Sequence, residues 1–405
     1  MDPHARLMAV PKFGRGPCLD RMTQLLRVLG CDSLAPGIKV TGSNGKGSTT
    51  AVAAAILGAH GLRTGRYTSP HLLDFRERIA VDGVPIPLPA FDAVLERVLH
   101  SAESVAPGAF GSFEFTTAIA ARWFLEQEVE ALVWEAGIGG RLDATRPLRA
   151  PVTVITSVGL EHTALLGGTH EAIVREKAEL ADTHSRLLLP PLAPALVTAA
   201  TLQLAPRHVA VEIVPPLGSD APLGLLGAHQ RQNAALAHCS AQVLLGAAFD
   251  ARLASQALAT ARWPGRLDLR RHASGARVVI DGAHNLDGVL AVAEALRSEP
   301  SLAPRPPGRR VLVFGASLDR PAREMLAVLR PLAEALVVTA ARHKGTPPED
   351  FAPDATRAPS VAAALEVAAA LAGPAGIVVV TGGLFLAAEA VAGFEGVDPL
   401  TLRFW

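Results

Sequence analysis

Residues 39–48, with the sequence KVTGSNGKGS, combine groups that could bind a polyphosphate. An apolar strand leads into a glycine-rich turn, and an alanine-rich helix follows. The backbone N–H groups of such a turn and the positive end of the helix favour an anion at one point. Lys46 adds a charge for the terminal phosphate, and Ser48 offers a hydroxyl to magnesium. The segment predicts an ATP-binding loop made by Gly42, Asn44, Gly45, Lys46, Gly47, Ser48 and Thr49.

The spacing of this loop differs from the common pattern G-x-x-x-x-G-K-[ST]. Here the first glycine lies closer to Gly45, and an extra glycine, Gly47, follows the lysine. An ordinary glycine-rich turn is the alternative interpretation. The strand before the loop and the helix after it favour phosphate binding.

Two further polar residues follow apolar runs. Glu135 comes directly after residues 131–134, so it would end a strand at the edge where open α/β sheets bind ligands. Its carboxylate is a donor that magnesium prefers, although it could also be a solvated loop acid. His162 lies just past the apolar run 152–155, but a lone histidine is more often a packed or surface residue.

Lys177 falls within a predicted helix over residues 169–181, with Thr169 as its N-cap. It lies four residues after Ile173 and three before Leu180, on the apolar face of that helix. A lysine there could bend outward to solvent. A buried lysine would instead have a lowered pKa and react more readily as the neutral amine.

Two residues further along could contact the nucleotide, and two more polar residues follow an apolar strand. The amide of Asn233 suits a base or ribose, and Arg266 follows a Pro-Gly break where it could reach a phosphate. Asp281 and His284 end an apolar strand. A polar helix residue, a surface arginine and a strand-end turn are the respective alternatives.

Short apolar runs alternate with helical patterns throughout, which indicates mostly parallel sheets covered by helices. The fold class is α/β, with a larger N-terminal P-loop-type domain and a smaller C-terminal Rossmann-like domain. The Pro264-Gly265 break sets the expected domains at residues 1–264 and 265–405. Proline-rich stretches at 84–89, 190–194 and 304–307 are expected to be loops, and residues 185–223 give no readable pattern. Expected strands are 38–41, 131–135, 152–157, 277–281, 310–315, 335–339 and 376–381, and expected helices are 46–59, 91–102, 116–128, 286–297, 320–329 and 360–371.

The composition excludes several functional classes. Lys plus Arg and Asp plus Glu each number 38, so the net charge of about zero gives no reason to expect nucleic-acid or membrane partners. Three scattered cysteines indicate neither a disulfide framework nor a zinc site. Residues 1–6 lack the apolar core of a signal peptide, and the apolar stretch 361–380 is interrupted by Glu366 and Pro374. These features favour a cytoplasmic protein.

The motifs together resemble those of the folylpolyglutamate synthase and dihydrofolate synthase family, within the Mur ligase superfamily. The resemblance rests on the loop at 42–48 and on further segments in the same order along the chain. These are RYTSPHLLDFRERI (66–79), SFEFTT (112–117), EAGIGGRLDAT (135–145), GLEH (159–162), EKA (176–178), GAHQRQN (227–233), WPGR (263–266) and DGAHN (281–285).

The resemblance implies an ATP-dependent carboxylate–amine ligase that adds L-glutamate to a folate, and also to dihydropteroate, through an acyl phosphate. It implies two Mg²⁺ ions, with Glu135 and Ser48 as ligands of one and His162 of the other. Lys177 would be carbamylated and help to hold metal. The catalytic group would be Lys46, Lys177 and His162, and the family expectation is a monomer. Asp281 and His284 would face the cleft and contact the nucleotide or the incoming glutamate. The folate or pteroate site would include Thr68, Ser69, Pro70, His71, Arg78 and Phe113.

Two other functions are open: a cell-wall Mur ligase, which the segment YTSPH disfavours, and a non-catalytic nucleotide-binding homologue. Some positions depart from the family pattern. Arg146 stands in place of asparagine, Glu179 in place of glycine near Lys177, and Gly383 in place of serine. The last change puts details of glutamate recognition in question.

Overall fold

A computed structural model describes residues 7, 9–11 and 14–404. The expectation about a signal peptide concerns residues 1–6, which lie outside this set. Within the described residues, no helix is both long and apolar enough to cross a bilayer.

The first part of the chain forms an eight-stranded sheet in the order β4-β3-β2-β5-β1-β6-β7-β8. All neighbouring pairs are parallel except β2 with β3 and β3 with β4. The strands are β1 (Gly37–Thr41), β2 (Thr64–Tyr67), β3 (Ile79–Val81), β4 (Val84–Pro85), β5 (Ala131–Glu135), β6 (Val152–Ile155), β7 (Arg186–Leu189) and β8 (Ala210–Ile213).

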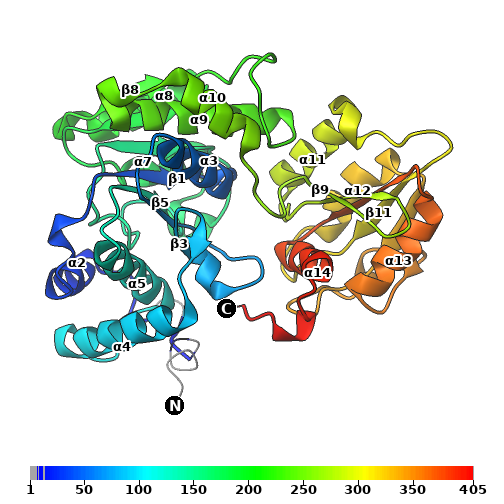
Figure 1. Cartoon of the computed structure of the whole chain (residues 1–405), viewed down its shortest axis with the longest axis horizontal. Helices are drawn as coiled ribbons and strands as arrows, with labels where there is room; N and C mark the ends of the chain where they lie inside the picture. The colour runs from blue at the N-terminus through cyan, green and yellow to red at the C-terminus, as the bar shows by residue number, and fades with distance from the viewer. Residues whose placement is uncertain (1–6, 8, 12–13, 405) are drawn as a thin grey trace.

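Helices cover both faces of this sheet (Figure 1). Alternate side chains of each strand point to opposite faces, so Val133 packs beneath α3 while Trp134 faces α5. On one face lie α3 (Lys46–Ala59), α9 (Ala228–Leu245) and α10 (Ala251–Thr260). On the other lie α2 (Leu19–Val28), α4 (Leu88–Val105), α5 (Ser112–Glu126), α7 (His170–Ala178) and α8 (Pro194–Leu204), and the short α6 (Thr163–Leu166) precedes α7.

The second part forms a six-stranded sheet in the order β13-β12-β11-β14-β10-β9, in which only β9 runs antiparallel to its neighbour. Helices α11 (Leu286–Ser298) and α12 (Ala322–Leu329) cover one face, and α13 (Val361–Ala372) and α14 (Leu384–Glu395) cover the other. The strands are β9 (Asp268–Arg271), β10 (Arg277–Ile280), β11 (Arg310–Phe314), β12 (Ala335–Val338), β13 (Thr356–Arg357) and β14 (Ile377–Thr381).

The predicted α/β class and its two parallel-sheet units are confirmed. The domain boundary between residues 264 and 265 stays a prediction, although no strand lies between β8 and β9 in the described chain. Two of the expected loops are wrong in part. Residues 84–85 pair as β4, and α4 begins at Leu88 while α8 begins at Pro194, because proline is well tolerated in the first turn of a helix.

Candidate active site

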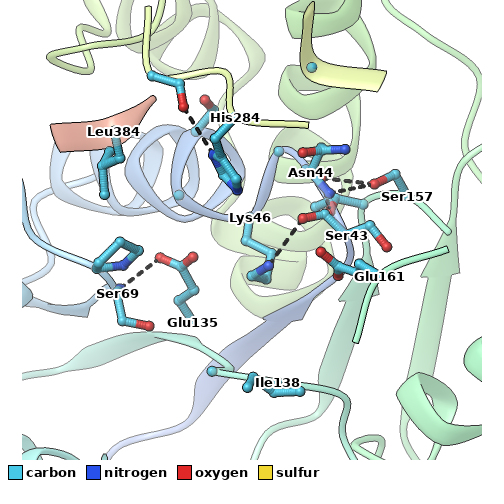
Figure 2. Close-up of a pocket in the computed structure, with 18 of the residues that line it drawn as sticks. Ser43, Asn44, Lys46, Ser69, Glu135, Ile138, Ser157, Glu161, His284 and Leu384 are labelled. Atoms are coloured by element: carbon cyan, nitrogen blue, oxygen red, sulfur yellow. Dashed lines mark hydrogen bonds between the residues drawn. The ribbon is translucent and has the colours of Figure 1, made fainter. Parts of the chain in front are cut away.

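Three neighbouring strands bring the predicted residues to one edge of the first sheet. The central strand β1 pairs in parallel with β5 on one side and β6 on the other. The loop 42–45 follows β1, Glu135 ends β5, and residues 156–162 follow β6. Because parallel strands end at the same edge, residues from all three segments line one cavity of about 760 Å³ (Figure 2).

The loop after β1 is shaped by glycines. Gly42 and Gly45 have φ values of 148° and 89°, which side chains rarely allow. A Cβ atom at Gly45 would also collide with the Asn233 amide, and one at Gly47 would lie 3.0 Å from the Trp263 indole nitrogen. The close approach of α9 and the 263–266 segment therefore accounts for the extra glycine in the loop.

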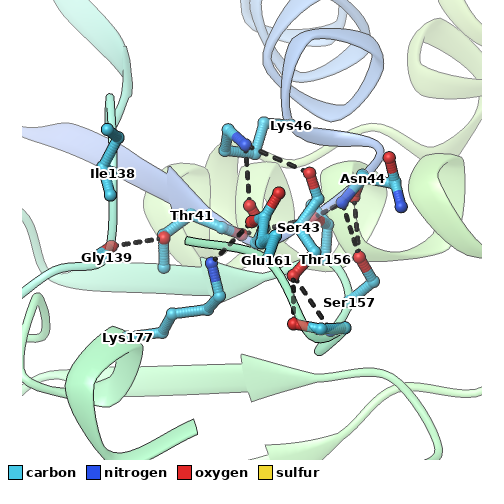
Figure 3. Close-up of polar contacts among 12 residues, drawn as sticks. Thr41, Ser43, Asn44, Lys46, Ile138, Gly139, Thr156, Ser157, Glu161 and Lys177 are labelled. Carbon is cyan, nitrogen blue, oxygen red and sulfur yellow. Dashed lines mark hydrogen bonds and ion pairs between the residues drawn. The ribbon is translucent and has the colours of Figure 1, made fainter. Parts of the chain in front are cut away.

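Residues after β6 form hydrogen bonds to the backbone of this loop. The Asn44 N–H donates to the Ser157 hydroxyl over 2.8 Å, and that hydroxyl donates to the Asn44 carbonyl over 3.0 Å (Figure 3). The Thr156 hydroxyl donates to the same carbonyl over 2.6 Å. This scaffold fixes the loop before any ligand binds, which lowers the entropy lost on binding.

Lys46 and Glu135 face the cavity. The Lys46 ammonium donates to the Gly42 and Ser43 carbonyls over 2.7 and 3.3 Å. Glu135 is only 3% exposed and accepts one bond, from the Ser69 N–H over 3.1 Å. Burial raises the pKa of Glu135 to about 7, while Lys46 and the Ser69 N–H act in the opposite direction.

Lys177 lies just behind the cavity wall. Its helix begins as predicted, since the Thr169 hydroxyl accepts from the Ala172 N–H, and its side chain is 1% exposed. The ammonium lies 3.3 Å from Glu161, which lines the cavity (Figure 3). Burial and then the charge of Lys46 lower the pKa of Lys177 to about 8, and Glu161 partly offsets them. Burial alone would raise the pKa of Glu161, but Lys46 and Lys177 hold it below its ordinary value.

The second domain supplies the opposite wall. Both Asp281 oxygens accept backbone bonds, from Leu267 and Ala283 over 2.9 and 2.8 Å, so this carboxylate shapes the turn. His284 lies over the loop, and burial lowers its pKa to about 4, which keeps the ring neutral (Figure 2). The Asn285 amide donates to the Asn44 side chain over 3.1 Å and joins the two domains at the phosphate loop.

Most predicted site residues line this one cavity, but five of them do not. Gly42, Thr49, Thr68, His71 and Lys177 lie outside its wall. Thr49 and His71 are packed against α9 and the C-terminal segment, respectively. The residues that line it are Asn44, Gly45, Lys46, Gly47, Ser48, Ser69, Pro70, Arg78, Phe113, Glu135, His162, Asn233, Arg266, Asp281 and His284.

Several cavity residues were not predicted as functional. Glu161 and Asp143 lie inside recognised motifs, so their acidic character was the available signal. Both oxygens of Asp143 accept bonds, from the Gly137 N–H over 2.8 Å and the Thr145 hydroxyl over 2.6 Å, and shape the loop after β5. Phe404 gave no signal, because it reaches the cavity from the far end of the chain.

The change at Glu179 does not alter the surroundings of Lys177 directly. Glu179 accepts from Gln203 over 2.6 Å and pairs with Arg207 over 3.3 Å. Arg146, the second departure from the family pattern, lies 3.8 Å from Glu179. The two unusual residues therefore balance each other's charge away from the cavity.

The cavity offers oxygen donors that would suit a divalent ion together with nucleotide phosphates. Within residues 7, 9–11 and 14–404, no cluster of three or more His, Cys, Asp or Glu side chains could hold a metal by itself. The Ser48 hydroxyl and the sparsely bonded Glu135 carboxylate both face the cavity. Oxygen donors of this kind, joined by substrate phosphates, suit Mg²⁺.

The fold and the site together define a Mur-type ligase. Residues 265–384 match the family described as Mur ligase, glutamate ligase domain. The chain is 34% identical over 371 residues to the dihydrofolate synthase/folylpolyglutamate synthase of Bacillus subtilis, covering 82% of each chain. The chain belongs to the folylpolyglutamate synthase/dihydrofolate synthase family, and is an ATP-dependent ligase.

Solved structures agree with this assignment. Mycobacterium tuberculosis folylpolyglutamate synthase, complexed with ADP and AMPPCP, superposes with a TM-score of 0.84 at 30% identity, over 95% of this chain and 96% of that one. Escherichia coli FolC with DHPP and ADP gives 0.86 at 25% identity, over 97% and 96%. A bifunctional synthase with Mn, AMPPNP and L-glutamate bound gives 0.84 at 24% identity over 98% of both chains, a likeness of fold.

Proposed function

We propose that this protein joins L-glutamate to the carboxylate of a folate, and also to dihydropteroate, with hydrolysis of ATP to ADP and phosphate. The observation that carries the proposal is a single cavity shared by two domains. The cavity is lined by the phosphate loop around Lys46, by His284 of the second domain, and by Arg78 and Phe113. The cavity thus combines a loop suited to a nucleotide with a cation and an aromatic ring suited to an anionic aromatic acceptor.

The reaction follows from placing these substrates together. A carboxylate oxygen of the folate bonds to the γ-phosphorus while the bond to ADP breaks, giving an acyl phosphate. The glutamate nitrogen then attacks the acyl carbon, loses a proton and displaces phosphate. Lys46 would stabilise charge on the transferred phosphoryl group, and the two domains would orient the reactants.

We propose two Mg²⁺ ions, one held by Ser48 and Glu135 and the other by His162 with a carbamylated Lys177. When bound, they would neutralise charge on the phosphate oxygens. His162 and Glu161 both line the cavity, and Lys177 lies 3.3 Å from Glu161, which supports the second position. The other nucleotide and acceptor contacts are proposed for those predicted residues that line the cavity. A cytoplasmic monomer without nucleic-acid or membrane partners also stays a prediction.

Labelled L-glutamate distinguishes the two acceptors. Purified protein, ATP and Mg²⁺ are incubated separately with 7,8-dihydropteroate and with tetrahydrofolate, and the labelled product is separated by chromatography. Incorporation into both acceptors is expected. No incorporation into either acceptor, with ATP still bound, would overturn the proposal.

The proposed role of Glu135 predicts that stabilisation by Mg²⁺–nucleotide increases with pH. The folded-state pKa of about 7 lies above the ordinary 4.5, so the metal-free protein loses stability as pH rises between these values. Metal requires the ionised form, and its affinity should fall roughly tenfold for each pH unit below 7. The rise in Tm caused by Mg²⁺–AMPPCP should therefore be larger at pH 8 than at pH 6. Glu135→Gln should make the rise small at both pH values, and an equal rise in the unaltered protein at both would contradict the role.

A further inference from the structure

The C-terminal segment crosses from the second domain to the first. Leu402 is buried in the core beneath α13 and α14, and anchors residues 402–404, which we call the C-terminal latch. After Leu402, the latch contacts the loop between β2 and β3 of the first domain (Figure 1). The latch therefore adds a contact between the two domains, in addition to the Asn285–Asn44 hydrogen bond.

His71 is a residue of the first domain that contacts the latch. Its Nε2 lies 2.6 Å from the Arg403 carbonyl oxygen, and its ring stacks on Phe404 with centroids 5.4 Å apart and planes 6° apart. The Arg78 Nε–H donates to the other ring nitrogen, Nδ1, over 3.0 Å. A carbonyl only accepts and an arginine only donates, so the ring must be neutral with its proton on Nε2. His71 is 3% exposed and thus bridges protein groups behind the cavity wall.

Arg78 is the connection from this bridge to the cavity. Its side chain is buried, lies over the Phe75 ring at 4.9 Å and lines the same cavity as Glu135. Phe404 lines that cavity directly, where it packs against Phe385 with centroids 4.7 Å apart. One aromatic residue of the latch thus forms cavity wall on one side and supports the His71–Arg78 pair on the other.

We propose that Phe404 is a positioning residue for the folate or pteroate acceptor. It forms part of the acceptor's apolar wall and, through His71, holds the Arg78 guanidinium where the acceptor carboxylate binds. The inference rests on the proposed function, which supplies an anionic aromatic acceptor. Because the latch is anchored in the second domain, the acceptor site is complete only when the domains adopt the arrangement seen here.

Acceptor affinity tests this role without requiring turnover. Binding of 7,8-dihydropteroate to the full-length protein with Mg²⁺–AMPPCP is measured by calorimetry. Phe404→Ala is expected to raise the acceptor Kd by about tenfold and to leave the AMPPCP Kd unchanged, since loss of one wall contact and one buttress typically has that effect. Phe404→Tyr should restore the affinity. Phe394→Ala, on the same domain but outside the cavity lining, is the matched control and should bind normally.

A second variant tests the path through His71. His71→Phe keeps the ring but loses both hydrogen bonds, so it should weaken acceptor binding by a similar factor. If the two residues act together, the double variant Phe404→Ala/His71→Phe should bind little worse than either single variant. Unchanged acceptor affinity in Phe404→Ala, equal weakening of both ligands, or multiplying effects in the double variant would overturn the proposal.

Failure of the latch and failure of the proposed function give different results. If the unaltered protein binds acceptor but adds no glutamate, the proposed function fails. The acceptor affinities of the Phe404 and His71 variants still test the role of the latch. If it binds no acceptor, both are overturned.

Discussion

Replacing Lys46 with methionine is expected to lower kcat for glutamate ligation by about a thousandfold, at the upper end of what removal of one charge-stabilising donor costs. Among the residues that the structure describes, the Lys46 ammonium donates hydrogen bonds only to the Gly42 and Ser43 carbonyls, in the phosphate loop. It can therefore turn to a phosphoryl group without breaking a buried ion pair. Methionine keeps the apolar stem but removes the charge, so the fold should be retained.

Steady-state rates with saturating ATP, glutamate and folate check this expectation. Lys344→Met, at an exposed lysine of the second domain, is the matched control and should keep the full rate. Thermal unfolding of both variants should resemble that of the unaltered protein. A Lys46→Met enzyme within tenfold of the normal kcat would show that phosphoryl transfer depends on other groups.

Lys177→Ala should have the next largest effect, a loss of roughly a hundredfold or more in kcat. With a pKa of about 8, roughly a tenth of Lys177 is neutral at pH 7, and only this form attacks carbon dioxide. Carbamylation would form a nitrogen–carbon bond and release a proton from the amine, so that a cation would be replaced by an anion beside Glu161. Raising the pH through 8 increases the neutral fraction and should therefore speed carbamylation.

Activity after removal of carbon dioxide measures this step. The depleted enzyme should recover on addition of bicarbonate, and more quickly at pH 8.5 than at pH 7. With ¹³C-labelled bicarbonate, a carbamate signal should appear in the unaltered protein and be absent from Lys177→Ala. Full activity without carbon dioxide, together with no carbamate signal, would contradict carbamylation. The role of Lys177 would then be its ion pair with Glu161.

Local sequence patterns were sufficient to predict the elements that form the phosphate site. The run at 131–135 and the helix at 46–59 have the predicted bounds, because apolar runs flanked by glycine are strong signals. The strand expected at 152–157 ends at Ile155, because Thr156 and Ser157 turn their hydroxyls to the Asn44 backbone. A local pattern cannot show such a long-range hydrogen bond.

The unreadable region 185–223 contains β7, α8 and β8. Strand β8 lies at the edge of the sheet, and its side chains are mostly exposed, so it lacks the alternating apolar pattern of a half-buried strand. Strand β9 was missed for a related reason, since three of the four residues in its sequence DLRR are charged and it pairs at the other sheet's edge.

Most predicted residues that fall in motifs line one cavity, whereas contacts between distant segments were not predicted. The motif placed His71 beside the acceptor, yet the structure directs both its ring nitrogens to protein atoms. Its partner Phe404 lies 333 positions further on in the numbering, so no spacing rule could connect them. The same holds for the Asn285–Asn44 contact, which joins the domains at the phosphate loop.

Transfer of oxygen from the acceptor to phosphate tests the central claim most directly. Folate labelled with ¹⁸O in the reacting carboxylate is incubated with ATP, Mg²⁺ and L-glutamate, and the released phosphate is analysed by mass spectrometry. Activation as an acyl phosphate predicts one ¹⁸O atom in each phosphate, because the oxygen that attacked the γ-phosphorus leaves with it. Unlabelled phosphate accompanying amide formation would contradict carboxylate activation by ATP in this cavity.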